Sequence, residues 1–215
     1  MRDEYGEVDH LVSTGKEITE RLRQQKEESR AVLHDPQTGL ANRAYFLDRL
    51  ARAVGRAEVL GQHVAVVAVR VDLAELVTPE MGGEVQGELL LQLVHRLLQV
   101  APAGEAVGRL GKDEFAICLR EVDGSEAVEA FARRIVDAFA DPVATSGYEL
   151  YVMPRLGLCL YPDQAEEGRA LLDCAHLAAV SGQGQGRAGY RFFEPGMGLP
   201  GGERRSEERR VGKEC

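Results

Sequence analysis

The sequence feature that most constrains the fold is an unbroken run of β-branched and other apolar residues at positions 64–71. A continuous apolar run of this length is typical of a strand that is covered on both faces, whereas a half-exposed strand alternates apolar and polar residues. We therefore expect residues 64–71 to form a central strand with other elements packed on both sides. Residues 63–71, the longest smooth apolar run, are far too few to span a bilayer.

The remaining elements follow from helical periodicity, strand-like runs and turn residues. We expect helices at 17–33, 42–57, 87–100, 125–140 and 167–180, and strands at 106–110, 114–120, 150–161 and 190–193. Residues 111–113 form the tight hairpin between two of the strands. Ser125 is a candidate cap for the helix that it begins. Mixed helices and strands of this kind indicate an α/β (α+β) sandwich around a single sheet.

The charge balance narrows the classes of partner. The chain has 26 Lys and Arg against 35 Asp and Glu, a formal charge of −9. This balance argues against binding of nucleic acid through a broad positively charged surface. The four cysteines have no metal-ligand spacing, and no basic-then-apolar leader opens the chain. We expect a reduced, cytoplasmic protein with no nucleic-acid partner and no direct membrane contact.

Five short motifs carry a resemblance to a known family. Residues 34–43 resemble the pattern DxLTGLxNR, and residues 109–116 (RLGKDEFA) resemble RLGGDEFA. Three further matches lie at 83–90, 156–162 and 186–193. Together, in this order, they resemble the GGDEF family, the diguanylate cyclases of bacterial signalling. The resemblance implies a nucleotidyl-cyclase-like fold, with an antiparallel-rich sheet ringed by helices and a signature β-hairpin.

The resemblance also implies an activity and its metal. The family condenses two GTP molecules into cyclic di-GMP with the help of Mg²⁺, a cation that prefers hard oxygen ligands. Asp72 and Asp113 match the two metal carboxylates of the family. Asp113 and Glu114 are then the catalytic residues, with Glu114 assisting at the metal or at the attacking hydroxyl. From the residues alone, the alternatives are that Asp72 is a polar stop to a buried strand and that Asp113 is a turn residue.

Three further residues are candidates for binding the substrate. By the resemblance, Arg187 and Lys112 would hold phosphate and Glu88 would face guanine. Lys112 replaces the second glycine of the signature, and a glycine allows close backbone approach and positive φ. Gln183 replaces a lysine that normally meets the triphosphate, and residues 102–105 lack the RxxD motif of product inhibition.

The positions that contact guanine in the family also differ in this chain. The stretch 71–83 is one residue shorter than the family motif and has no clear match for its asparagine. Each lost buried hydrogen bond costs about 1–3 kcal/mol. We therefore expect a degenerate, regulatory or dimerising domain with weak or no cyclase activity. The alternatives are an active diguanylate cyclase and an interaction scaffold that binds no nucleotide.

Both ends of the chain resemble pieces of segments that are not part of the domain itself. Residues 1–17 resemble the end of a PAS sensor domain, and residues 18–34 resemble the signalling helix that follows such a domain and pairs in a homodimer. The GGDEF-like domain then occupies 35–195 and a linker 196–204. Residues 205–215 resemble a translated sequencing adapter. We expect the natural protein to continue, with an EAL domain as one candidate.

Overall fold

The computed structural model describes residues 32–181 and 189–197 of the 215-residue chain. Its helices are α2 (Arg43–Leu60), α3 (Leu73–Leu76), the 3-10 turn η1 (Pro79–Met81), α4 (Gly82–Val100), α5 (Ser125–Ala138) and α6 (Gly168–Ser181). Its strands are β1 (His63–Arg70), β2 (Ala106–Arg109), β3 (Glu114–Val122), β4 (Val143–Thr145), β5 (Tyr148–Leu150), β6 (Arg155–Tyr161) and β7 (Gly189–Phe192). The predictions for residues 1–17, for nearly all of the upstream helix and for 198–215 lie outside the described residues.

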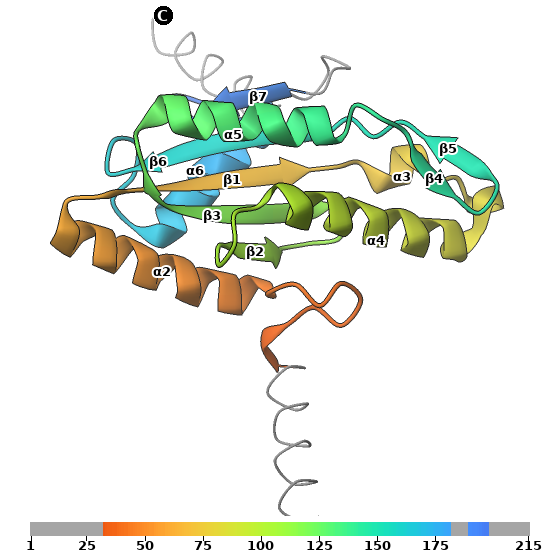
Figure 1. The fold of residues 1–215 in the computed structure, drawn as a ribbon, viewed down its shortest axis with the longest axis horizontal. Helices are drawn as coiled ribbons and strands as arrows, with labels where there is room; N and C mark the ends of the chain where they lie inside the picture. The colour runs from red at the N-terminus through yellow and green to blue at the C-terminus, as the bar shows by residue number, and fades with distance from the viewer. Residues whose placement is uncertain (1–31, 182–188, 198–215) are drawn as a thin grey trace, which may run out of the picture.

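Strand β1 lies at the centre of the main sheet, as its apolar run predicts. The five-stranded sheet has the order β2-β3-β1-β6-β7, and a separate two-stranded sheet pairs β4 with β5. Only the pair β6–β7 is parallel; the other neighbours are antiparallel. Figure 1 shows helices α4 and α5 in front of the sheet and α6 behind it. The expected antiparallel-rich sheet with surrounding helices and a β2–β3 hairpin is confirmed.

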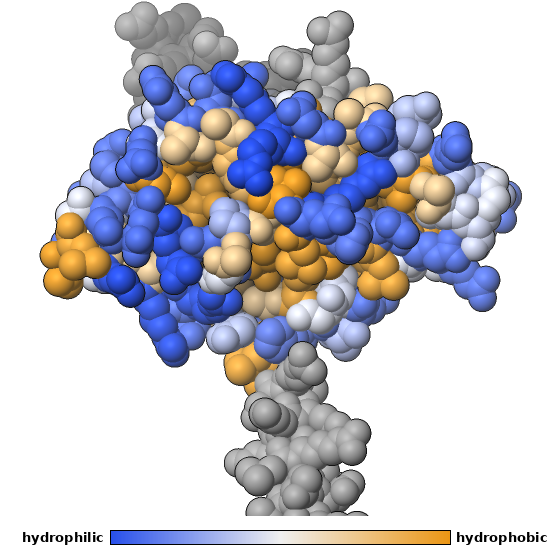
Figure 2. All heavy atoms as spheres, in the orientation of Figure 1, coloured by the Kyte–Doolittle hydropathy of each residue, from blue (hydrophilic) through white to orange (hydrophobic). Residues whose placement is uncertain are grey.

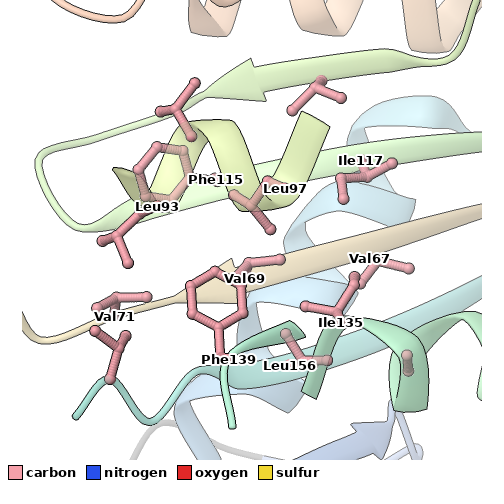
Figure 3. Close-up of a cluster of buried hydrophobic side chains, with 14 of the residues drawn as sticks. Val67, Val69, Val71, Leu93, Leu97, Phe115, Ile117, Ile135, Phe139 and Leu156 are labelled. Atoms are coloured by element: carbon pink, nitrogen blue, oxygen red, sulfur yellow. The ribbon is translucent and has the colours of Figure 1, made fainter. Parts of the chain in front are cut away.

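Alternate residues of β1 point into two separate hydrophobic layers, as the two-residue period of a strand requires. Val67 and Val69 belong to the cluster on one face that includes Leu93 of α4 and Ile135 of α5, and Figure 3 shows this cluster in close-up. Val66, one position away, belongs to the opposite layer with α2 and α6. The buried side chains of both layers make β1 the structural axis of the domain.

Two glycines allow close contact between the sheet and the helices behind it. A Cβ atom on Gly157 of β6 would lie 1.9 Å from the carbonyl oxygen of Ala175 in α6. A Cβ on Gly108 of β2 would lie 2.7 Å from the ring of Phe46 in α2. Both distances are far below contact distance, so any side chain at either position would push a helix away from the sheet.

The structure corrects three of the predicted elements. Helix α4 begins at Gly82, five residues before the predicted start, because its first turn contains the exposed residues Gly82, Gly83 and Glu84 and carries a weak apolar pattern. Ser125 is the first residue of α5 and makes no capping hydrogen bond; Gly124 holds the cap position instead. The predicted strand at 150–161 is two strands, β5 and β6, separated by a segment that contains Pro154, which lacks an amide donor for a ladder.

The surface over α4 keeps some apolar side chains. Figure 2 shows orange atoms among the blue polar ones on the face that α4 and α5 cover. Leu91 and Leu98 of α4 are each about half exposed, whereas Leu93 in the same helix is fully buried. These leucines provide matched inside and outside positions on one helix.

Candidate functional site

The candidate site lies where β1 ends and β3 begins. Because these strands are antiparallel, Arg70 at the end of β1 is paired with Glu114 at the start of β3. The amide of Val71 donates a hydrogen bond to the carbonyl oxygen of Asp113 at 3.0 Å. This register brings the predicted carboxylates Asp72 and Asp113 to the same edge of the sheet, one from each neighbouring chain segment.

The Asp72 carboxylate is held by two arginines. Its Oδ2 atom forms an ion pair with Nη2 of Arg155 on β6, and its Oδ1 atom lies 3.4 Å from Nε of Arg70. The Asp72 side chain is 19% exposed and the Arg155 side chain 20%. Partial burial of this kind reduces the screening of the pair by water. Asp72 is therefore already neutralised by side chains of its own chain.

A pocket of about 250 Å³ opens beside this ion pair. Its lining comes from the segment between β1 and the end of α3 and from the segment that leads into β6: Val71, Asp72, Glu75, Leu76, Tyr151, Met153 and Arg155. Tyr151 and Met153 are more than half exposed and form part of its rim. The Asp72–Arg155 pair is therefore accessible to a small solute in spite of its low exposure.

The two acidic residues of the signature turn have different surroundings. The Oδ1 atom of Asp113 is buried and has no hydrogen-bond partner among the residues that the structure describes. Glu114 Oε1 lies 2.5 Å from Nδ1 of His176 on α6. Asp113 thus keeps a free acceptor, while Glu114 is tied to the helix behind the sheet.

Arg109 fixes the signature turn to the first loop of the domain. Its Nη1 atom donates to Asp35 Oδ1 at 3.0 Å and to Gln37 Oε1 at 2.8 Å, and its Nη2 atom donates to the Lys112 carbonyl at 3.3 Å. Burial raises the pKa of the Asp35 carboxyl, but hydrogen bonds from Thr38 and Arg109 outweigh burial and bring that pKa below its usual range. The motif at 34–43 therefore serves to position the turn.

Lys112 is accommodated in the turn without strain in its backbone. Among the described residues only Glu121 has a positive φ outside glycine, so Lys112 does not need the left-handed conformation of the family glycine. Its side chain lines a second pocket, of about 170 Å³, with Gln37, Leu73, Gly83, Gln86, Gly87, Leu90 and Arg109. The lysine side chain therefore lines this pocket without closing it.

The Glu88 side chain contacts Ser146 and does not line that second pocket. The Glu88 carboxylate accepts hydrogen bonds from the Ser146 hydroxyl at 2.5 Å and from the Ser146 amide at 2.6 Å. These bonds lower the pKa of Glu88. The pocket lining from α4 includes Gln86 and Gly87 but not Glu88. A role of Glu88 towards guanine remains a prediction, and Arg187 lies outside the described residues.

The described side chains do not fit a magnesium site as they stand. Within residues 32–181 and 189–197, no group of three or more His, Cys, Asp or Glu side chains is placed to hold a metal ion. Mg²⁺ in proteins is usually bound by one or two carboxylates together with substrate phosphates. Here both oxygens of Asp72 face arginine nitrogens, while the buried Oδ1 of Asp113 has no partner among the described residues.

Sequence reasoning gave no role to Arg155 or to His176. A signal for Arg155 exists, since a charged residue directly precedes the apolar run 156–160. Its meaning depends on strand register, because only the pairing of Arg155 with Arg70 places it beside Asp72. His176 is a polar residue on an otherwise apolar stretch of helix, and its contact with Glu114 spans 62 positions of sequence.

Comparison with known proteins gives a consistent result. Residues 32–188 match the family described as "Diguanylate cyclase, GGDEF domain". An uncharacterized signaling protein of Caulobacter vibrioides is 34% identical over 165 residues, 76% of this chain and 20% of that protein. The bifunctional diguanylate cyclase/cyclic di-GMP phosphodiesterase MucR of Pseudomonas aeruginosa is 29% identical over 179 residues, 83% of this chain and 26% of MucR. The chain therefore spans only a small part of the length of these relatives.

Solved structures share the fold over most of the domain. The GGDEF domain of TpbB from Pseudomonas aeruginosa superposes with a TM-score of 0.71 at 29% identity, over 75% of this chain and 94% of that one. A sensory box/GGDEF family protein from Caulobacter crescentus gives a TM-score of 0.63 at 34% identity, over 68% of this chain and 95% of that one. Among the described helices, none combines the length and apolar character needed to cross a membrane.

Proposed function

Because the chain belongs to the GGDEF diguanylate cyclase family, we propose that its domain is a degenerate, regulatory member with weak or no cyclase activity. It acts through dimer geometry in a PAS-linked cyclic di-GMP signalling protein, with the helix at 18–34 joining two copies. The length of the curated relatives, one of them named as bifunctional, supports a multidomain setting with a downstream EAL domain.

The observation that carries this proposal is the state of Asp72. In the family this carboxylate serves the metal, whereas here its two oxygens face Arg155 and Arg70. A carboxylate neutralised by arginines has little remaining attraction for a cation. We expect Mg²⁺ at Asp72 and Asp113 only if GTP binding is retained.

The surroundings of the second pocket support the same conclusion. Thr78 and Pro79 occupy the region of the family asparagine that reads guanine, and Glu88 is engaged by Ser146. Each buried hydrogen bond lost to guanine costs about 1–3 kcal/mol, so the loss of two would weaken GTP binding by about 30-fold or more, at about 1.4 kcal/mol per tenfold. GTP is therefore at most a weak ligand of this domain.

The alternative of an active diguanylate cyclase is favoured by two observations. Lys112 adopts an ordinary backbone conformation and lines the pocket, where its charge would attract phosphate. Asp113 retains a buried oxygen without a partner among the described residues. An active enzyme would use these two residues in place of the complete family set.

Turnover of GTP by the full 215-residue chain distinguishes the two functions. The chain is incubated with GTP and Mg²⁺ or Mn²⁺, and cyclic di-GMP is quantified by mass. We expect no product above that of Asp113→Ala. Asp123→Ala, the same change at an exposed position just after the far end of β3, serves as the matched control.

Cyclic di-GMP that disappears in Asp113→Ala but not in Asp123→Ala would overturn the proposal and identify an active cyclase. Absence of product from a folded, dimeric chain would support the regulatory function. GTP binding by that same sample would then indicate a nucleotide sensor, and absence of binding would indicate the scaffold alternative.

A further inference from the structure

We propose that Arg155 is a built-in counter-ion that takes the place of a divalent cation at Asp72. Its guanidinium keeps Mg²⁺ and Mn²⁺ from binding at this edge of the sheet. The inference rests on the proposed function, because it names the residue that makes the site degenerate. Its test uses metal alone, so its failure can be told from a failure of the proposed function, which is tested by product formation.

The strand register builds this counter-ion into the fold. Arg155 is the first residue of β6 and is paired with Arg70, the last residue of β1, while Asp72 follows two positions later. The two arginines therefore flank the carboxylate from neighbouring strands, one at each oxygen. Since β1 and β6 are held together by a continuous ladder, the arginine does not depend on a loop for its position.

Burial makes the pairing with Arg155 effective against a competing ion. The side chains of Asp72 and Arg155 are each about one-fifth exposed, whereas Arg70 is one-third exposed. Charges in such partly buried positions interact more strongly than surface charges, because less water screens them. A divalent ion at Asp72 would have to displace a bound guanidinium and remain beside a second positive charge.

A divalent cation could reach Asp72 from solvent, so lack of access is not what would exclude it from this site. The ion pair lines the pocket of about 250 Å³, which Glu75 also lines. Asp113, held beside Val71 by its carbonyl, still has a free oxygen among the described residues. Without the Arg155 charge, the pocket would present the carboxylates of Asp72 and Glu75 and room for a partly hydrated ion. The positive charge of Arg155 is therefore the feature that prevents binding.

Binding of Mn²⁺ without nucleotide tests this inference. The full chain is titrated with Mn²⁺, and the free ion is followed by its paramagnetic resonance signal. We expect Arg155→Ser and Arg155→Gln to bind Mn²⁺ about tenfold or more tightly than the unchanged chain, because each removes one positive charge beside the carboxylate. Arg155→Lys, which keeps the charge, should behave as the unchanged chain does.

Two controls test whether the gained Mn²⁺ binding depends on the Asp72 carboxylate and on the position of the removed positive charge. The double variant Asp72→Asn with Arg155→Ser should lose the gained binding. Arg52→Ser removes the same charge from an exposed ion pair on α2 and should leave Mn²⁺ binding as it is. A gain in Arg52→Ser equal to that in Arg155→Ser would mean a general effect of net charge and would overturn the proposal.

Three further results would contradict the counter-ion role. The first is Mn²⁺ binding by the unchanged chain that Asp72→Asn abolishes. The second is a neutral variant that retains its circular dichroism spectrum but gains no binding. The third is the loss of folded structure in both neutral variants, which would make Arg155 a structural anchor. A gain in either folded neutral variant that depends on Asp72 supports the proposal.

Discussion

At the scale of single residues, Arg109 makes the contacts that shape the signature turn. Its side chain is only 9% exposed, and Asp35 supplies the opposing charge. Because Asp35 also accepts bonds from the Thr38 amide and hydroxyl, one carboxylate satisfies both the loop and the arginine. The motif at 34–43 thus has a structural role in holding the signature turn.

We predict that Asp35→Ala destabilises the domain by about 2 kcal/mol, because a nearly buried guanidinium loses its charged partner. Urea unfolding followed by circular dichroism measures the change. Gln37→Ala removes a second, exposed acceptor of Arg109 and should cost less than about 0.5 kcal/mol. Equal effects of the two substitutions would contradict the role assigned to Asp35.

The lowered pKa of Asp35 also predicts how stability depends on pH. A carboxyl whose pKa is lower in the folded state contributes stability above its ordinary pKa, and this contribution is lost as the pH falls through the folded value. The ordinary value is 3.8, so the loss begins near that pH and continues below it. Asp35→Asn should therefore show a shallower loss of stability on acidification than the unchanged chain; an identical slope would contradict the prediction.

Gly157 gives a prediction about backbone contact. Gly157→Ala should cost more than about 3 kcal/mol, at the upper end of overpacking, since its Cβ would meet the α6 backbone at 1.9 Å. Gly55→Ala, on the exposed side of α2 with nothing within 4 Å, should instead stabilise the domain by about 0.5–1 kcal/mol. Thermal unfolding compares the two, and a neutral Gly157→Ala would contradict the contact.

At the scale of elements, local pattern predicts the strands of the sheet and the helices that pack on it. The apolar run of β1, the periodicity of α5 and the glycine-containing turn before Glu114 each identify an element by itself. The β4–β5 hairpin was not predicted, because it consists of two three-residue strands whose pairing lies apart from the main sheet. Such short strands have too few residues for a period-two signal.

The site was predictable only in part for a related reason. The carboxylates Asp72 and Asp113 are identified by motif position, and strand register places them at one edge. The partners of these residues come from distant segments: Arg155 lies 83 positions from Asp72, and Ser146 lies 58 positions from Glu88. Sequence spacing carries no information about such contacts until the sheet order is known.

The contact between Glu88 and Ser146 leads to a prediction about the small hairpin. Glu88→Ala removes the acceptor of two hydrogen bonds from the β4–β5 turn, so the amides of 143–150 should exchange faster with deuterium. Glu84→Ala, an exposed acid on the same helix, should leave that exchange unchanged. Unaltered exchange in Glu88→Ala would mean that the carboxylate is free for another ligand.

At the scale of the whole molecule, two hydrophobic layers share one sheet. Leu93 of α4 belongs to the layer on one face, and Leu50 of α2 belongs to the layer on the other. Every strand of the main sheet is bonded to its neighbours, so loss of either layer exposes one face of the same hydrogen-bonded ladder. We therefore expect the two layers to unfold together, as in a single cooperative domain.

A pair of core substitutions tests this coupling. Leu50→Ala and Leu93→Ala each remove a fully buried side chain and should each cost about 3 kcal/mol. Because the two leucines lie on opposite faces of the sheet and share no partner layer, the double variant should lose the sum within about 0.5 kcal/mol. Leu91→Ala, half exposed on the same helix as Leu93, should cost less than about 0.5 kcal/mol.

Calorimetry should show one unfolding transition in every variant, because both hydrophobic layers pack on the same sheet and unfold with it. Two separated transitions in Leu93→Ala would mean that the layers fold independently and that β1 does not join them.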